Sequence, residues 1–154
     1  MLKVYFYAGY IPQIANQFMA KDKIHEIVIR ALIKDGWIIT HDPYVLKMKP
    51  GQSIDVGAEK IIIAERGIEK IAVEIKSFLT SSKLYKFYEA LGQFMSYRIG
   101  LRSQEPDRIL YLAMPEKVYK QLMEYTTVPE TIEEANLKIV TIDLVNENIV
   151  AWME

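Results

Sequence analysis

The sequence contains no cysteine and only two histidines among its 154 residues. The lack of cysteine excludes disulfides and thiolate metal centres, and two histidines argue against a histidine-rich zinc site. We therefore expect any bound metal to be a hard cation held by oxygen ligands.

Long apolar runs are also missing, and the longest run is far too short to span a bilayer. The first residues show neither the cationic segment nor the small-residue cleavage site of a secretory signal. These two features predict a cytoplasmic protein that does not enter a membrane.

An excess of charge of one sign is absent too, because the formal net charge is −1. Nucleic-acid binding would therefore need a local basic patch or the charge of a partner. The length and the 51% hydrophobic content suit one domain with a single core. Residues 1–18 are aromatic and almost uncharged, which predicts an N-terminal extension outside a domain formed by residues 19–154.

Hydrophobic periodicity and turn residues predict the element order α-β-β-β-α-β-α-β-β. The expected helices are 21–35, 83–102 and 116–125, and a loop is expected at 126–130. The expected strands are 37–41, 53–64, 68–78, 108–114, 137–145 and 149–152. In helix 83–102 we expect a buried stripe of Leu84, Phe87, Tyr88, Leu91 and Met95, with the opposite side facing solvent or a cleft.

Two of these strands, 53–64 and 68–78, carry the candidate chemistry, and they reverse at Gly67. Glu74 and Lys76 are expected on one face of the second strand, roughly 7 Å apart, since side chains alternate along a strand. Asp55 lies on the first. A carboxylate pair on adjacent strands suits Mg²⁺, and a lysine beside it can stabilise charge in phosphodiester hydrolysis.

Simpler interpretations exist for two of these acids. Glu74 and Lys76 also fit the ordinary polar alternation of a solvated sheet face, which frequency alone favours. Glu26 shares a helix face with the apolar Ile29 and Ile33, which suits a covered site, but it also suits an exposed ion pair with Arg30 four residues on.

The full order Glu26, Asp55, Glu74, Lys76, Gln93, Tyr97, with a helix on either side of the strands, resembles the PD-(D/E)XK nuclease superfamily. Within it, the segments MAKDKIHEIVIRALIKDGWIITHDPY, SIDVGAEK, IAVEIKSF and YEALGQFMSYR resemble the XisH family of fdxN element excision controlling factors. The resemblance runs from Met19 to the end of the chain. One departure is Ile54, which stands where the superfamily has proline.

The resemblance implies a restriction-endonuclease-like α/β fold with a mixed central sheet flanked by helices. It implies Mg²⁺ or Mn²⁺ held by Asp55, Glu74 and the Ile75 carbonyl, with Lys76 acting on the attacking water. Glu26 would steady a metal-bound water. Gln93 and Tyr97 would turn toward the active site, where the Gln93 amide would orient Lys76 or contact the DNA backbone. Residues that can contact DNA are Lys47, Lys49, Lys83, Lys86, Tyr97 and Arg98.

Two main functions follow from this resemblance, and a scaffold protein with a vestigial site is a third outcome. The first is a metal-dependent DNA endonuclease associated with excision of a DNA element. The second is a non-catalytic excision-controlling module that acts on DNA through a companion such as a XisI-like factor or a recombinase. Superfamily members are frequently dimers, so a homo-oligomer is expected in either case.

Overall fold

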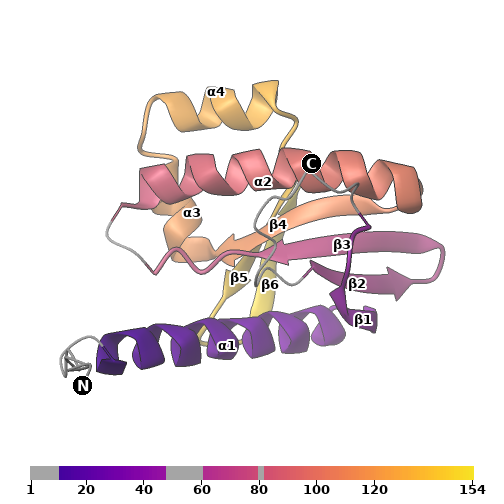
Figure 1. Ribbon diagram of the computed structural model, residues 1–154, viewed down its shortest axis with the longest axis horizontal. Coiled ribbons are helices and arrows are strands. Elements are labelled where there is room, and N and C mark those ends of the chain that lie inside the picture. Colours follow the sequence, from indigo (N-terminus) through magenta and orange to yellow (C-terminus); the bar gives the residue numbers. More distant parts are fainter. Residues whose placement is uncertain (1–10, 48–60, 80–81) are drawn as a thin grey trace, which may run out of the picture.

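The computed structural model describes residues 11–47, 61–79 and 82–154. These residues form one six-stranded sheet with four helices (Figure 1). The strands are β1 (Ile38–Tyr44), β2 (Ile61–Arg66), β3 (Glu69–Ile75), β4 (Ile109–Pro115), β5 (Ile139–Asp143) and β6 (Asn148–Met153). The helices are α1 (Ile11–Lys34), α2 (Lys83–Gln104), α3 (Glu116–Leu122) and α4 (Thr127–Glu134).

The sheet is mixed, and its spatial order follows the order of the chain from β1 to β6. The first three strands pair antiparallel, β3, β4 and β5 pair parallel, and β5 and β6 pair antiparallel. Gly67 makes the β2–β3 turn with φ of +60°, a conformation that glycine adopts at little cost. The parallel β3–β4 pair needs a crossover, and α2 supplies it. The predicted α/β class with a mixed, helix-flanked sheet is confirmed.

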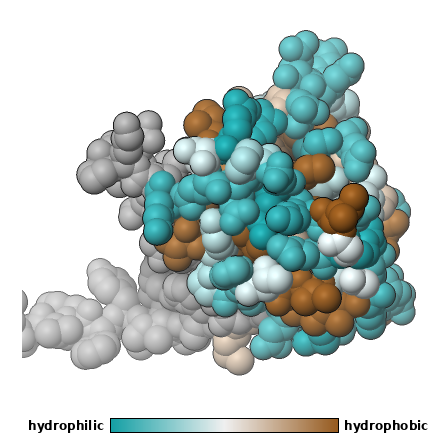
Figure 2. Space-filling view, turned by 90° about the vertical axis from the view of Figure 1, so that its right-hand side faces the viewer, coloured by the Kyte–Doolittle hydropathy of each residue, from teal (hydrophilic) through white to brown (hydrophobic). Residues whose placement is uncertain are grey.

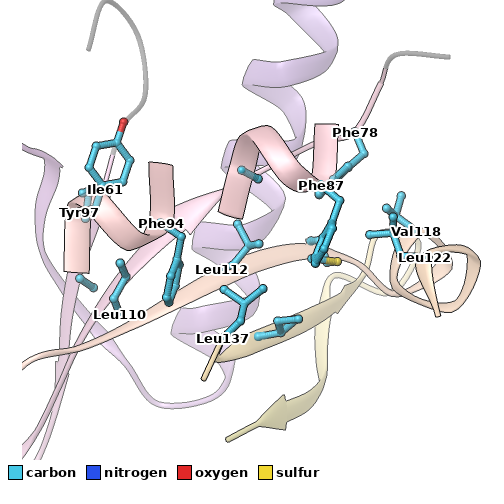
Figure 3. Close-up of a cluster of buried hydrophobic side chains, with 14 of the residues drawn as sticks. Ile61, Phe78, Phe87, Phe94, Tyr97, Leu110, Leu112, Val118, Leu122 and Leu137 are labelled. Atoms are coloured by element: carbon cyan, nitrogen blue, oxygen red, sulfur yellow. The ribbon is translucent and has the colours of Figure 1, made fainter. Parts of the chain in front are cut away.

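Alternating strand residues build two cores on opposite faces of the sheet. Ile61 and Ile63 face α2, whereas Ile62 and Ala64 face α1. Figure 1 shows α1 and α2 on opposite sides of the sheet, and Figure 3 shows the core beneath α2. No helix among the described residues is long and apolar enough to cross a bilayer.

The buried stripe of α2 differs from the predicted one. Its buried residues are Phe87, Ala90, Phe94, Tyr97 and Leu101. Tyr88 and Met95, which were expected inside, are each 41% exposed. Phe87 is buried as predicted, and Leu84 and Leu91 pack against the core. The prediction was wrong for Tyr88 and Met95 because α2 carries apolar residues on more than one face, so periodicity does not define a single stripe.

Other boundaries also shifted. Residues 127–134 form α4, so the loop predicted at 126–130 is helical from Thr127 on, because Pro129 lies in the first turn, where its missing N–H is tolerated. β1 continues past Pro43 to Tyr44, since it pairs on one side only among the described strands and can accommodate proline.

α1 begins at Ile11 and continues unbroken across the proposed boundary at residue 18. The predicted strand 53–64 is seen as β2 from Ile61 onward.

Candidate functional site

Glu74 is the most deeply buried acidic residue that the structure describes. It lies in β3, opposite Ile61 of β2 and Leu112 of β4, and is 1% exposed. Removing a carboxylate from water costs several kcal/mol unless charges or hydrogen bonds compensate. The ordinary polar alternation of a solvated sheet face is therefore wrong for Glu74.

Lys76 supplies a positive charge beside this carboxylate. Its Nζ lies 3.3 Å from Glu74 Oε1, and its side chain is 16% exposed. Its backbone N–H donates to the Ala113 carbonyl at 2.9 Å, which extends the parallel β3–β4 pairing by one residue beyond β3. The strand pairing therefore fixes the position of the Lys76 main chain at the end of β3.

Gln93 of α2 completes the described group. Lys76 Nζ donates to Gln93 Oε1 at 2.6 Å, so the ammonium is held between a strand carboxylate and a helix amide. The family resemblance implied that Gln93 either orients Lys76 or contacts the DNA backbone, and the structure brings the side chains of Gln93 and Lys76 together. The carbonyl of Ala113, which holds the Lys76 backbone, was missed because parallel strand pairing has no local sequence signal.

This group has defined chemical capacities. A buried carboxylate interacts with an adjacent cation far more strongly than an exposed one does. An ammonium with a fixed position can stabilise negative charge that develops on a substrate. The Glu74 carboxylate and the Ile75 carbonyl can both serve as oxygen ligands, which a hard cation requires. Within the described ranges, no three Asp, Glu, His or Cys side chains are grouped as metal ligands.

The remaining predicted catalytic residues are not part of this group as described. Asp55 lies outside the described residues and stays a prediction. Glu26 is exposed on α1, whose core face packs against the sheet face opposite to that of Glu74. Its carboxylate lies 3.7 Å from Arg30 Nη1, so the simpler interpretation as an i,i+4 ion pair is confirmed.

The predicted DNA contacts that the structure describes are spread along the length of α2. Lys47 is exposed beside Gln104, at the C-terminal end of α2. Lys83 and Lys86 are in the first turn of α2, roughly 27 to 32 Å from Gln104 at the helical rise per residue. Lys86 is paired with Glu89 at 2.9 Å. Lys49 lies outside the described ranges.

Two more of the predicted DNA contacts belong to the body of the fold. Tyr97 is 2% exposed, so the prediction that it lies on a DNA-contacting surface is wrong. It was misplaced because the stripe of α2 was predicted in the wrong register. Arg98 donates to main-chain carbonyls at the end of α4, which periodicity along α2 could not reveal.

Comparison with known proteins decides the family. The sequence model described as "XisH protein" matches residues 18–150, most of the chain. The chain belongs to the XisH family. No curated protein matches the chain.

Two solved structures support membership of the XisH family. One is an XisH family protein from Nostoc punctiforme PCC 73102, with 42% sequence identity and a TM-score of 0.78. The other is an fdxN element excision controlling factor protein from Anabaena variabilis, with 43% identity and a TM-score of 0.78. Each similarity covers 86% of this chain and 99% of the other protein. The family resemblance predicted from the sequence is therefore confirmed.

Proposed function

We propose that this XisH family protein is a metal-dependent endonuclease of the PD-(D/E)XK type that hydrolyses phosphodiesters during excision of a DNA element. The observation that carries the proposal is the grouping of a fully buried Glu74 with Lys76 at 3.3 Å. The excision context comes from the Anabaena variabilis relative, an fdxN element excision controlling factor protein.

The oxygen ligands that Glu74 and the Ile75 carbonyl offer suit Mg²⁺ or Mn²⁺. Glu74 and the Ile75 carbonyl would hold the ion together with Asp55, all through oxygen atoms. When bound, the ion supplies Lewis-acid stabilisation and lowers the pKa of water. Lys76 places a positive charge next to the scissile phosphate, where negative charge develops. Gln93 holds that ammonium in position through its amide oxygen.

Plasmid nicking with Mg²⁺ tests this proposal. We expect Lys76→Ala to reduce nicking at least 100-fold, because it removes the charge that stabilises the transition state. Lys70→Ala removes a lysine from the same strand outside the group, and should nick as the wild type does. Circular dichroism establishes that each variant is folded. Nicking by Lys76→Ala at the wild-type rate would contradict the assignment of Lys76.

Calorimetric titration with Mg²⁺ and Mn²⁺ tests the metal separately. We expect the wild type to bind either ion, Asp55→Asn to bind at least ten-fold more weakly, and Lys76→Ala to bind about as well as the wild type. Equal affinity of the wild type and Asp55→Asn would remove Asp55 from the ligand set.

A second candidate function is a non-catalytic controlling module of the same fold. The name of the Anabaena variabilis relative describes control of excision, and the net charge of −1 provides little general attraction for DNA. Such a module would act beside a recombinase or a XisI-like companion. Metal binding without nicking, in the presence of plasmid and either ion, would favour this function over hydrolysis.

A further inference from the structure

A cavity of about 190 Å³ lies where the C-terminal half of α2 passes over the beginnings of β4 and β5. Four of its lining residues are cations, namely Arg98, Arg102, Arg108 and Lys138, and none of the described residues that line it is acidic. The whole chain carries a net charge of −1, so this local concentration of positive charge does not follow from composition. Because cations surround it, the cavity is a candidate anion-binding site.

Arg108 stabilises the wall of the cavity. Its side chain is 6% exposed, and its Nη2 lies 2.9 Å from Glu65 Oε1. Its Nε lies 3.3 Å from Glu105 Oε2. Two carboxylates therefore balance this guanidinium, and we assign it no ligand.

Arg98 is held differently. Its Nη1 donates to the carbonyls of Ala135 at 2.9 Å and Asn136 at 3.0 Å, and its guanidinium lies 5.6 Å from the Phe94 ring centroid. Carbonyls and an aromatic ring fix the side chain without cancelling its charge. Both bonds use Nη1, so they leave Nε and Nη2 for another acceptor. The result is a cation with a fixed position at the cavity.

Arg102 and Lys138 are the two adaptable cations of the cavity. Neither forms a salt bridge with another residue in the part of the chain that the structure describes. Arg102 is exposed and Lys138 is partly exposed, so both can move toward a ligand. Phe94 and Leu101 supply an apolar wall. Figure 2 looks onto the side where α2 ends and β4 begins, which is mainly hydrophilic with separate hydrophobic residues.

We propose that this cavity is a phosphate-binding site, in which Arg98, Arg102 and Lys138 bind the phosphate oxygens and the apolar wall contacts the group that carries it. Arginine in particular suits phosphate, because its planar donors match the oxygens. The phosphate comes either from a nucleic acid or from a free small organic phosphate. Arg98 and Arg102 lie five and nine residues beyond Gln93, roughly 8 and 13 Å along α2, so the cations of this cavity are distinct from Lys76 and their binding of phosphate does not require hydrolysis there.

The test is calorimetric binding by the full chain, with EDTA present and ionic strength fixed. The probes are a 5′-phosphorylated oligothymidylate, the same oligomer without the terminal phosphate, and inorganic phosphate. We expect Arg102→Gln/Lys138→Gln to weaken binding of the phosphorylated oligomer at least ten-fold. The control Lys21→Gln/Lys117→Gln removes two charges from exposed positions elsewhere, and should bind as the wild type does.

Each outcome has a defined meaning. Tighter binding of the phosphorylated oligomer than of the unphosphorylated one assigns the site to a nucleic-acid end, and equal binding that depends on Arg102 and Lys138 assigns it to internal phosphates. Binding of inorganic phosphate, with no binding of either oligomer, assigns the site to free phosphates. Binding of no probe, or equal binding by the wild type and Arg102→Gln/Lys138→Gln, overturns the proposal. Lys76→Ala should retain the binding, which separates this test from that of hydrolysis.

Discussion

At the scale of single residues, the sequence and its family resemblance singled out Glu74, Lys76 and Gln93, which the structure brings together, but could not decide their exposure. A Glu-x-Lys pattern looks the same on a solvated face and in a closed site, and only the neighbouring strands distinguish them. Glu74 is buried because β2 and β4 both lie beside it and α2 covers its face. Glu26 shows the converse, since apolar neighbours suggested a covered position for a side chain that is exposed.

Another residue-scale feature gives a prediction about pH. Arg30 donates to both carboxylate oxygens of Glu147, at 2.6 Å and 2.9 Å, which joins α1 to the β5–β6 turn. These hydrogen bonds lower the pKa of Glu147 below its ordinary value of 4.5. A carboxyl group with a lowered pKa in the folded state adds stability above the pKa of the unfolded state, and this stability is lost as the pH falls through the folded value.

We therefore expect Glu147→Gln to be less stable than the wild type at pH 7, with a difference that shrinks as the pH falls below about 4.5. Urea denaturation at several pH values between 3 and 7 measures this difference. Glu124→Gln, at an exposed position on the surface, serves as the control and should differ little from the wild type at any pH. A difference for Glu147→Gln that stays constant across this range would contradict the role of the ion pair.

At the scale of elements, α2 shows where periodicity is informative and where it is not. The helix itself was predicted nearly to its ends. Its buried face was not, because Tyr85, Tyr88, Met95 and Ile99 place apolar side chains on the exposed side. Only the packing partners on β4, such as Leu110 and Leu112, select the true face. The β5–β6 hairpin was easier, because its strands and its turn have local signals.

The register of α2 leads to a prediction. We expect Phe94→Ala to destabilise the fold by about 3 to 5 kcal/mol, as is usual for truncation of a buried aromatic ring. Met95→Ala, one position further on, should cost less than about 1 kcal/mol because that side chain is 41% exposed. Urea denaturation of both variants measures the contrast, and similar losses of stability would place the buried face elsewhere.

At the scale of the whole molecule, the two cores share one sheet. Ile62 points into the core beneath α1, and Ile63 points into the core beneath α2. Because each strand from β2 to β5 contributes to both, neither core can be lost while the other persists. The sequence indicated the mixed sheet only through the family resemblance, since the order of strands depends on contacts between distant segments.

We therefore expect a single unfolding transition. Trp37 and Trp152 belong to the core beneath α1, so their fluorescence reports that face, whereas far-ultraviolet circular dichroism also reports α2. The two signals should give the same urea midpoint in the wild type, and Ile62→Ala and Ile63→Ala should each shift both signals together. Separate midpoints in any of the three proteins would show that the cores unfold independently.

The crossover through α2 also bears on the order of folding. The hairpins β2–β3 and β5–β6 close short loops, so they can form early. The β3–β4 pair can form only after the long connection through α2 has folded back onto the sheet. Until α2 and β4 pack against the β2–β3 hairpin, Glu74 remains hydrated, and Lys76 lacks its hydrogen bonds to Gln93 and to the Ala113 carbonyl. A nascent chain would therefore bring Glu74, Lys76 and Gln93 together only after α2 has docked and β4 has paired with β3.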